Sequence, residues 1–228
     1  ERYEAIGKTS LELKFFAPAS RDEFRRRLIE DGYVVGMETH STMKNGKDLD
    51  VQVYAQLFAI ENTRYILTLV EDITQRKRVE QFEQFRGQAL EQLAEGQPIK
   101  AILESLVRGV EAIDPTIRAS ILLVDTDGRH LIKGAAPSLP DFYNEAINGL
   151  TIAEGIGSCG TAAATGHLVI VEDIMNHPYW ANFRDLAAKA NLGSCWSQAI
   201  VDNTGRVMGT FGIYHDHPHR PTAEDLKL

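Results

Sequence analysis

Cysteine and long hydrophobic runs are both scarce in this sequence. Two cysteines in 228 residues cannot build a disulfide framework, and the N-terminus does not resemble a signal peptide. The longest apolar stretches are only a few residues long, whereas crossing a bilayer takes about 20 residues. These absences exclude a disulfide-stabilised secreted protein and a membrane-spanning one. They predict a cytoplasmic protein without direct membrane contact.

Positive charge is also in the minority. Lys and Arg total 24 against 32 Asp and Glu, a net charge of −8, and no basic block could follow a phosphate backbone. Nucleic acid is therefore excluded as a partner. The composition, 43% hydrophobic and 25% charged, is that of a globular protein. Because domains usually hold about 100–150 residues, the length predicts two domains.

The N-terminal part predicts a short helix followed by three antiparallel strands. Residues 20–31 form the helix, in which Ser20 is the expected N-cap and Glu23 completes the spacing of a capping box. Apolar and polar residues then alternate within residues 33–70, which is the period of a half-buried strand. Asn45-Gly46 marks a tight hairpin between the first two strands, and a second turn contains Asn62.

Two helices are expected in the middle of the chain. Residues 72–94 and 98–113 are rich in helix-forming residues, and Gly96 and Pro98 separate them. The first helix carries an apolar stripe suited to pairing with its twin in a homodimer. Its members are Val79, Phe82, Leu90 and Leu93.

The C-terminal part mixes strands and short helices. Glycine, proline and Asp-Gly turns divide it into short segments. Expected strands cover residues 118–124, 129–135, 167–173, 195–201 and 207–215, and expected helices cover residues 141–147 and 184–191. This order describes a single antiparallel α/β sandwich.

The first part of the chain resembles the second half of a PAS domain. The matching stretches are IGKTSLEL (6–13), MKNGKDLDV (43–51) and VEDITQRKRVE (70–80), the last typical of the exit from a PAS domain into a signalling helix. The first strands and helices of a complete PAS fold are absent from the sequence.

Residues 96–228 resemble a GAF domain of bacterial multidomain sensors. The resemblance is carried by the stretches ASILLVDTDGRHLIKGAAPSLPDFYNEAI, GIGSCGTAAATG, VIVEDI, LGSCWSQAIVDNTGRVMGTFGIY and RPTAEDL. Together the two resemblances imply an α+β fold with two antiparallel-sheet domains joined by a long signalling helix. The implied boundaries are a partial PAS domain over 1–74, the linking helix over 75–96 and the GAF domain over 97–228.

The same resemblance implies an output module outside this sequence. Such pairs precede a diguanylate cyclase, a cyclic di-GMP phosphodiesterase or a histidine kinase. The 228 residues contain no GGDEF or EAL signature and no Walker loop. Glu1 is not preceded by Met and Leu228 falls inside an expected helix, so both ends are expected to be cut from a longer bacterial protein.

The glycine-rich stretch around Cys159 is the first candidate site. Its spacing does not match a dinucleotide fingerprint, because no βαβ unit surrounds it. The expected role is a pocket floor ahead of a short helix that starts at Thr161, whose free amides could bind an anion or a carbonyl. Gly157, Ser158, Cys159 and Thr161 are the expected ligand contacts; the alternative is close packing of backbone alone.

Three interpretations of the two cysteines remain open. Cys159 and Cys195 could be buried small apolar side chains, or a reversible redox pair, or one could be a catalytic thiol. The third follows from a resemblance of residues 157–161 to free methionine-(R)-sulfoxide reductases. In those enzymes the reactive cysteine lies in the loop after the next strand, which here reads NHPYW (176–180) and contains no cysteine. The enzyme is therefore the disfavoured alternative.

Aromatic residues supply the rest of the expected pocket. Trp180 lies in a loop, where binding residues collect, and Trp196 and Ser197 follow Cys195 at the start of a strand. We expect these three residues to line the ligand site. Phe183 and Tyr214 are expected to be core residues.

No cofactor is identified, and no metal site is expected. His215, His217 and His219 alternate at the end of a strand, but Pro218 interrupts it and a zinc site needs a further ligand. The residues that bilin-, flavin-, haem- and cyclic-nucleotide-binding relatives require do not stand at the matching positions.

The sequence thus predicts a sensory fragment that performs no chemistry of its own. It would bind an unknown small molecule in the GAF pocket or dimerise through helices 72–94 and 98–113. A ligand would signal by favouring one of two arrangements of these helices, which would bend against each other at Gly96 and Pro98. The alternative is a sulfoxide reductase or thiol redox sensor that uses Cys159 and Cys195.

Overall fold

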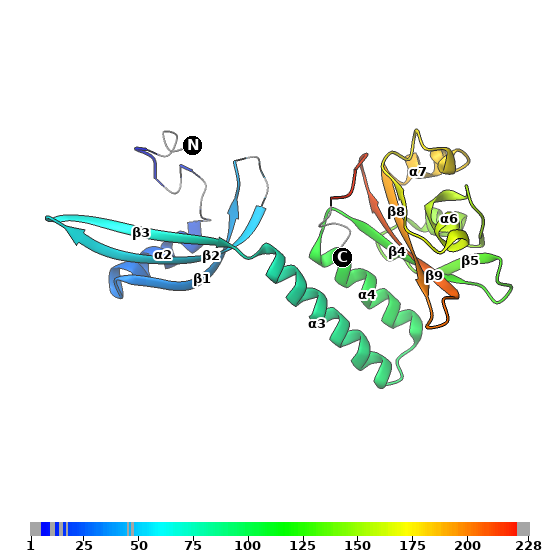
Figure 1. Ribbon diagram of the computed structural model, residues 1–228, viewed down its shortest axis with the longest axis horizontal. Helices are drawn as coiled ribbons and strands as arrows, with labels where there is room; N and C mark the ends of the chain where they lie inside the picture. Colours follow the sequence, from blue (N-terminus) through cyan, green and yellow to red (C-terminus); the bar gives the residue numbers. More distant parts are fainter. Residues whose placement is uncertain are drawn as a thin grey trace. The chain divides into compact units, whose positions relative to one another are not determined.

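A computed structural model describes residues 6–9, 12–13, 16, 18–44, 46 and 48–222 (Figure 1). The chain divides into two compact units, Glu1–Gln81 and Phe82–Leu228. The division falls inside one helix, α3 (Thr74–Ala94), whereas the sequence placed a boundary near each end of that helix. The three-part division of the chain therefore stays a prediction.

The first helix of unit 1 among the described residues is α2 (Pro18–Glu30). The helix starts two residues earlier than the sequence predicted, so Ser20 lies inside it and the expected capping box is wrong. Proline is accepted in the first turn because the N–H that it lacks has no intrahelical partner there. Gly32 follows with a φ of +76°, a left-handed conformation that ends the helix.

A three-stranded antiparallel sheet follows α2, as predicted. The strands β1 (Tyr33–Thr42), β2 (Asp48–Ile60) and β3 (Thr63–Asp72) lie in the order β1-β2-β3. On one face, Leu28 of α2 packs against buried Val34 and Ala55. On the other face, Glu38 of β1 forms ion pairs with Arg76 and Lys77 in the first turns of α3.

Both turns of this sheet fall where the sequence predicted them. Gly46 has a φ of +85°; Asn45, the other half of the expected hairpin signal, lies outside the described residues. Glu61 and Asn62 connect β2 and β3 with φ values of +45° and +67°. Two successive positive φ values are the signature of the type I′ turn, which matches the twist of the flanking strands.

Helix α3 and helix α4 (Ile99–Ile113) reproduce the two predicted helices. Asp72 accepts the backbone N–H of Thr74 at 2.9 Å and so stabilises the start of α3. Gly96 has a φ of +73°, and Pro98 precedes the first residue of α4. The chain therefore reverses between the two helices at the predicted joint.

Within unit 2, α3 and α4 lie side by side and run in opposite directions (Figure 1). They are in close contact at Gly109, where a Cβ atom would lie 2.6 Å from the ring of Phe85. The absent side chain of Gly109 therefore lets an aromatic ring of α3 rest directly on the backbone of α4.

Six antiparallel strands form the sheet of unit 2. They lie in the order β6-β5-β4-β9-β8-β7. Their bounds are β4 Arg118–Val124, β5 His130–Ala135, β6 Leu150–Thr151, β7 Val169–Val171, β8 Ser194–Val201 and β9 Val207–His215. The sequence predicted all of these strands except the two-residue β6.

The two faces of this sheet are covered by different helices (Figure 1). Helix α4 covers one face, where Val107 packs against Ala119 and Ile121. On the other face lie α5 (Asp141–Ile147), α6 (Gly157–Thr165), the 3₁₀ turn η1 (Pro178–Trp180) and α7 (Arg184–Lys189). Unit 2 is thus an α+β sandwich, as expected from the sequence.

The contact between Gly109 and Phe85 generates a prediction. Gly109→Ala should lower the free energy of unfolding of unit 2 by about 1–3 kcal/mol, because the new methyl group overpacks against the ring. Gly87→Ala in α3 is the matched control, since a Cβ there meets nothing within 4 Å. It should stabilise by about 0.5–1 kcal/mol through helix propensity. Urea unfolding of both variants measures this; equal effects would contradict the packing.

Candidate functional site

Helix α6 covers one side of the candidate site. Its residues Gly157–Ala163 are all buried, and the helix packs against β8 and β9. Gly157 opens the helix with a φ of +58°, and at Gly160 a Cβ atom would lie 2.8 Å from the carbonyl oxygen of Thr151. The glycines and small side chains of this stretch therefore allow backbone to approach backbone.

The helix starts at Gly157, four residues before the predicted start at Thr161. Thr161 lies inside the helix, where its hydroxyl donates to the Gly157 carbonyl at 2.6 Å and accepts the Gly155 N–H at 3.0 Å. The expected anion-binding amides at Thr161 are therefore wrong. This side chain fixes the loop that enters the helix.

A cavity of about 20 Å³ lies between α6, the sheet and η1. Its volume is close to that of one water molecule. The lining is mostly apolar and consists of Leu122, Ile147, Leu150, Gly157, Ser158, Cys159, Trp180, Phe183 and Tyr214. No charged side chain belongs to it, so the cavity suits an uncharged guest.

Trp180 closes the cavity and is itself 4% exposed. Its indole Nε1 donates to the hydroxyl of Ser158 at 3.0 Å, and that hydroxyl donates to the Cys195 carbonyl at 3.3 Å. Phe183 packs edge-on against the indole, with ring centroids 6.3 Å apart. The sequence placed Trp180 in an open loop, whereas the structure buries it as a hydrogen-bonded lid.

Polar groups beside the cavity surround the sulfur of Cys159. The Tyr214 hydroxyl lies 3.7 Å from this sulfur and 3.2 Å from the hydroxyl of Ser120. Gly212 leaves the space that they share, because a Cβ there would lie 3.1–3.3 Å from all three groups. Tyr143 supports Tyr214 edge-on, with ring centroids 6.2 Å apart.

The two cysteines lie together in this polar cluster, and both thiols are free. The hydrogen bond of the Cys195 thiol, followed by those of Ser197, Tyr214 and Thr210, lowers the pKa of Cys159 to about 6, although burial opposes the shift. Burial raises the pKa of Cys195 well above its ordinary value. Of the pair, Cys159 is therefore the more acidic thiol.

Of the expected site residues, Gly157, Ser158, Cys159 and Trp180 line the cavity together. Cys195 and Ser197 lie just beyond it, against Cys159. Whether any of these residues contacts a ligand stays a prediction.

Trp196 lies on the opposite face of the sheet from this cavity. Successive side chains of a strand alternate between faces, so Trp196 points away when Cys195 and Ser197 point towards α6. It packs instead with Ile117 and Ile213. The prediction that Trp196 shares the cavity with Cys159 is wrong for this reason.

Sequence reasoning missed the other side of the site. Tyr214 was assigned to the core alone, and Ser120 and Thr210 were not singled out. The alternation along each strand shows which residues share a face of that strand. It does not show which face of one strand matches which face of the next, because that depends on the strand register, which pairs Cys195 with Tyr214.

The three C-terminal histidines gather on the Trp196 face. The rings of His215 and His219 stack with centroids 4.3 Å apart, and the centroid of His215 lies 4.8 Å from Trp196. Among the residues that the structure describes, no group of three or more His, Cys, Asp or Glu side chains is arranged to hold a metal ion. In the same part of the chain, no helix combines the length and apolarity needed to cross a membrane.

Comparison with curated proteins identifies one relative by sequence. The chain is 37% identical over 157 residues to the methyl sulfide methyltransferase-associated sensor of Methanosarcina acetivorans. The alignment covers 69% of this chain and 16% of that protein. The chain therefore spans less than a fifth of the length of this relative.

Solved structures of other proteins share the fold. The free methionine-R-sulfoxide reductase from Neisseria meningitidis, in complex with its substrate, aligns with a TM-score of 0.52 at 19% identity, over 68% of this chain and 82% of the other. The GAF domain of a phosphoenolpyruvate-protein phosphotransferase from Coxiella burnetii aligns with a TM-score of 0.52 at 15% identity, over 65% and 83%.

The sequence profile of the GAF domain matches residues 96–228, more than half of the chain. This range contains α4, the six-stranded sheet and the whole of the cavity beneath Trp180. The chain belongs to the GAF domain family.

Proposed function

We propose that this chain is the sensory part of a signal-transduction protein and that its GAF domain binds a small, uncharged, largely apolar molecule. The observation that carries the proposal is the cavity closed by Trp180. The guest would enter by displacing the indole ring and would take over the hydrogen bond that Trp180 now gives to Ser158. The sensor name of the curated relative agrees with this role.

The chemistry of the lining defines the class of guest. Leu122, Ile147, Leu150 and Phe183 provide apolar contact, whereas Trp180 Nε1 is a donor that needs an acceptor. A small thioether has this character, because its sulfur is a weak acceptor between apolar groups. Dimethyl sulfide is the first probe to use, since the name of the curated relative refers to methyl sulfide.

Helices α3 and α4 would carry the signal. Helix α4 covers the sheet face opposite the cavity, and Phe85 of α3 rests on Gly109 of α4. A guest would shift an equilibrium between two arrangements of these helices by its differential affinity for them. We propose that the receiver is a cyclic di-GMP-metabolising or histidine kinase module C-terminal to Leu228, and that residues 1–74 form part of a PAS domain.

Homodimerisation through α3 and α4 is part of this proposal. The stripe predicted from the sequence is exposed in α3: Val79, Leu90 and Leu93 are each 59% exposed. An apolar stripe on an otherwise polar helix favours pairing with a second copy. The GAF domain itself is proposed to act without catalysis.

The ligand proposal predicts a difference between the two tryptophans. Native and denaturing mass spectrometry of the purified protein would first reveal a bound small molecule. In an isothermal titration with dimethyl sulfide, Trp180→Phe should then weaken binding about three- to tenfold, because one hydrogen bond is lost. Trp196→Phe is the matched control and should leave affinity unchanged, since Trp196 lies on the other face of the sheet. Equal effects of the two changes would contradict the site.

The dimer proposal predicts that charge on the stripe separates the copies. Leu90→Glu/Leu93→Glu should raise the dissociation constant about a hundredfold or more, because burial of two leucines is lost. Sedimentation equilibrium measures this as a lower weight-average mass. The control Gln84→Glu/Gln88→Glu adds the same charge to exposed positions on another face of α3. If both variants have the same mass as the parent chain, α3 is not the interface.

A second candidate function, thiol redox sensing, is favoured by the two free thiols that lie together beneath α6, with the Tyr214 hydroxyl 3.7 Å from the Cys159 sulfur. The Cys159 thiolate would attack hydrogen peroxide, giving a sulfenic acid and water after protonation. The Cys195 thiol would then displace a second water and close the disulfide, so that two thiols lose two electrons and two protons to the peroxide. The sulfoxide reductase interpretation lacks this kind of support, because NHPYW (176–180) offers no attacking thiol.

The redox candidate predicts a pH profile. The lowered pKa makes Cys159 a thiolate above about pH 6, so the rate at which peroxide oxidises Cys159 should rise through that pH and level off near neutrality. An ordinary thiol would continue to gain rate up to about pH 8.5. Intact mass after denaturing alkylation measures the loss of the free Cys159 thiol, and in Cys195→Ser it follows this step alone. Oxidation of Cys159 with an ordinary thiol profile would refute the activated thiol.

A further inference from the structure

Gly212 lies at the centre of a group of hydroxyl side chains on the sheet face that α6 covers. In the strand pairing, Gly212 of β9 lies between Ser120 of β4 and Ser197 of β8. Its neighbours on the same face of β9 are Thr210 and Tyr214, two residues away on either side. All four hydroxyl residues are buried, and we refer to them as the hydroxyl cluster.

The sulfur of Cys159 occupies the space above Gly212. A Cβ atom at Gly212 would lie 3.3 Å from this sulfur, 3.3 Å from the Tyr214 hydroxyl and 3.1 Å from the Ser120 hydroxyl. Cys159 also lines the small cavity beneath Trp180. The thiol of α6 is therefore held between the hydroxyl cluster of the sheet and the cavity.

Two members of the hydroxyl cluster lack a hydrogen-bond partner in the described part of the chain, Ser197 Oγ and Thr210 Oγ1. A buried hydroxyl without a partner is destabilising, so such a group calls for an explanation. A thiolate at Cys159 provides one. The pKa of Cys159 is lowered by the thiol of Cys195 and then by the hydroxyl groups of Ser197, Tyr214 and Thr210.

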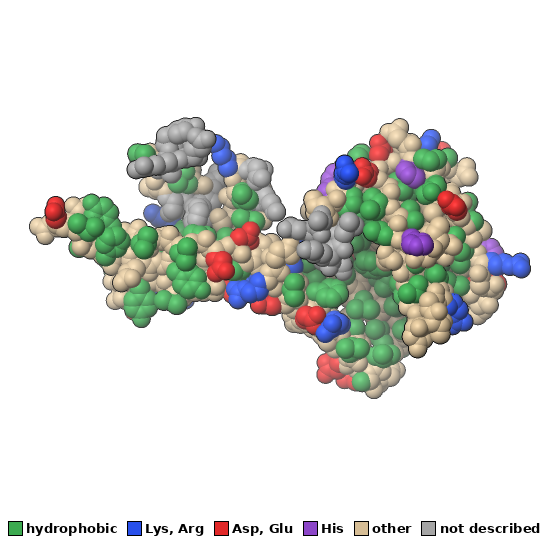
Figure 2. Space-filling view, in the orientation of Figure 1, with side chains coloured by type: hydrophobic (Ala, Val, Ile, Leu, Met, Phe, Trp, Pro, Cys, Tyr) green, Lys and Arg blue, Asp and Glu red, His purple; other side chains and the backbone are tan. Residues whose placement is uncertain are grey.

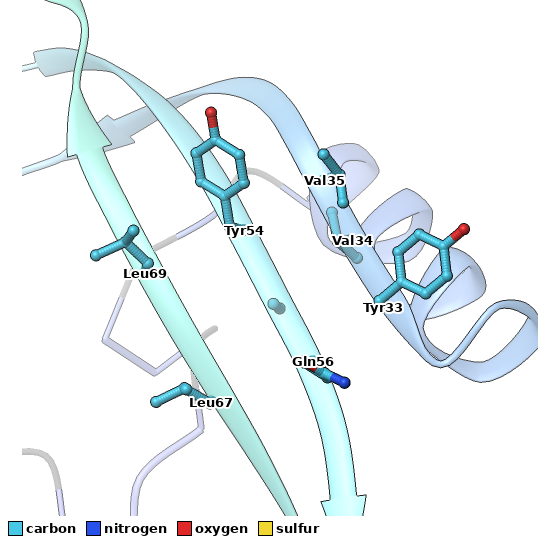
Figure 3. Close-up of a pocket in the computed structure, with 8 residues that line it drawn as sticks. Tyr33, Val34, Val35, Tyr54, Gln56, Leu67 and Leu69 are labelled. Atoms are coloured by element: carbon cyan, nitrogen blue, oxygen red, sulfur yellow. The ribbon is translucent and has the colours of Figure 1, made fainter.

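A larger hollow of the molecule lacks this combination of groups. It has a volume of about 330 Å³ and lies on the sheet of unit 1, where Tyr54, Leu67 and Leu69 belong to its lining (Figure 3). Hydrophobic side chains are spread over the visible face of this unit (Figure 2). The lining of the hollow contains no cysteine and no charged side chain, so it offers apolar contact without a reactive thiol.

We propose that Cys159 and the hydroxyl cluster form a reaction site for hydrogen peroxide, in which Tyr214 is the catalytic residue that gives a proton to the leaving oxygen. The inference rests on the second candidate function, thiol redox sensing, and names the residues that hold the thiolate and protonate the product. The cavity beside the sulfur has about the volume of one water molecule. This size favours hydrogen peroxide over alkyl hydroperoxides.

The reaction balances with peroxide as its oxidant. The Cys159 thiolate attacks one peroxide oxygen, so that an S–O bond forms and the O–O bond breaks. The sulfur loses two electrons and becomes a sulfenic acid, S–OH. The second oxygen leaves as hydroxide and takes the proton of the Tyr214 hydroxyl to become water. Tyr214 then regains a proton from solvent, because burial raises its pKa well above the ordinary value.

The position of Tyr214 suits this transfer. Its hydroxyl lies 3.7 Å from the sulfur, so an oxygen that approaches the sulfur also comes within reach of this donor. The Ser120 hydroxyl, 3.2 Å away, fixes its orientation. Among the described residues, the titratable groups that face the sulfur are Cys195 of β8, Tyr214 of β9 and Tyr143 of α5.

Two reagents separate proton donation from thiolate formation. In the full chain with Cys195→Ser, Cys159 is the only thiol, and intact mass follows its reaction with hydrogen peroxide or with iodomethane. Iodomethane releases iodide, which needs no proton, so its rate reports the thiolate alone. At neutral pH, Tyr214→Phe should slow the reaction with peroxide about tenfold or more relative to the reaction with iodomethane, because only peroxide needs the donor.

The chain offers matched controls for both roles. Tyr179→Phe removes a tyrosine hydroxyl that donates to Glu154 at 3.5 Å, and it should leave both rates unchanged. Ser197→Ala should slow both reagents equally near pH 6, because the thiolate loses a donor. Ser194→Ala removes an equally buried hydroxyl from the other face of β8 and should have no effect on either rate.

The outcomes separate this inference from the functions on which it rests. A selective loss of the peroxide rate in Tyr214→Phe, with folding checked by circular dichroism, is the expected result. Equal slowing of both reagents, or none, would overturn the donor role and leave thiol redox sensing intact. Faster oxidation by tert-butyl hydroperoxide than by hydrogen peroxide would overturn the assigned substrate. A folded parent chain whose Cys159 does not react with peroxide would overturn both this inference and redox sensing, whereas the dimethyl sulfide titration tests the ligand proposal separately.

Discussion

The alternation of side chains along β4, β9 and β8 is the constraint on which the GAF domain of this chain depends. One set of side chains, including Ile121, Ile213 and Trp196, packs on the α4 side. The other set, including Ser120, Tyr214 and Cys195, faces α6. The apolar contact with α4 therefore lies on one face of the sheet, and the polar cluster beneath α6 lies on the other. No residue of α4 lines the cavity, so the sheet lies between that helix and the cavity.

The close approach of α6 to the sheet sets the size of the cavity. Gly157, Ser158 and Gly160 allow this approach, and the remaining space is closed by Trp180. The cavity holds about one water molecule, so a larger ligand can enter only if Trp180 moves. The hydrogen bond between Trp180 and Ser158 makes that movement a discrete event, because a buried N–H without a partner is costly. A movement of this kind would serve the sensor function proposed above.

Unit 1 differs from unit 2 in how far its sheet is covered. Its helix α2 covers one face of a three-stranded sheet, and its edge strand β3 keeps both faces exposed. An isolated sheet of this size is marginal unless further strands or helices cover it. Much of the apolar surface of unit 1 therefore stays exposed in the described part of the chain. The cavity of unit 2, by contrast, is already closed by the chain itself.

How much the sequence determined depends on the range of the interactions involved. Local patterns were sufficient for the three strands of unit 1, for the turn at Asn62, for both long helices and for α5, because periodicity and turn residues act over a few positions. The glycine-rich stretch and Trp180 were also recognised as parts of the candidate site. Only the tertiary structure decided which strand faces meet. The register that sets Cys195 beside Tyr214 brought Tyr214 and Ser120 to the site and excluded Trp196. A shift of one residue exchanges the two faces of a strand, so no pattern within a single strand could decide this.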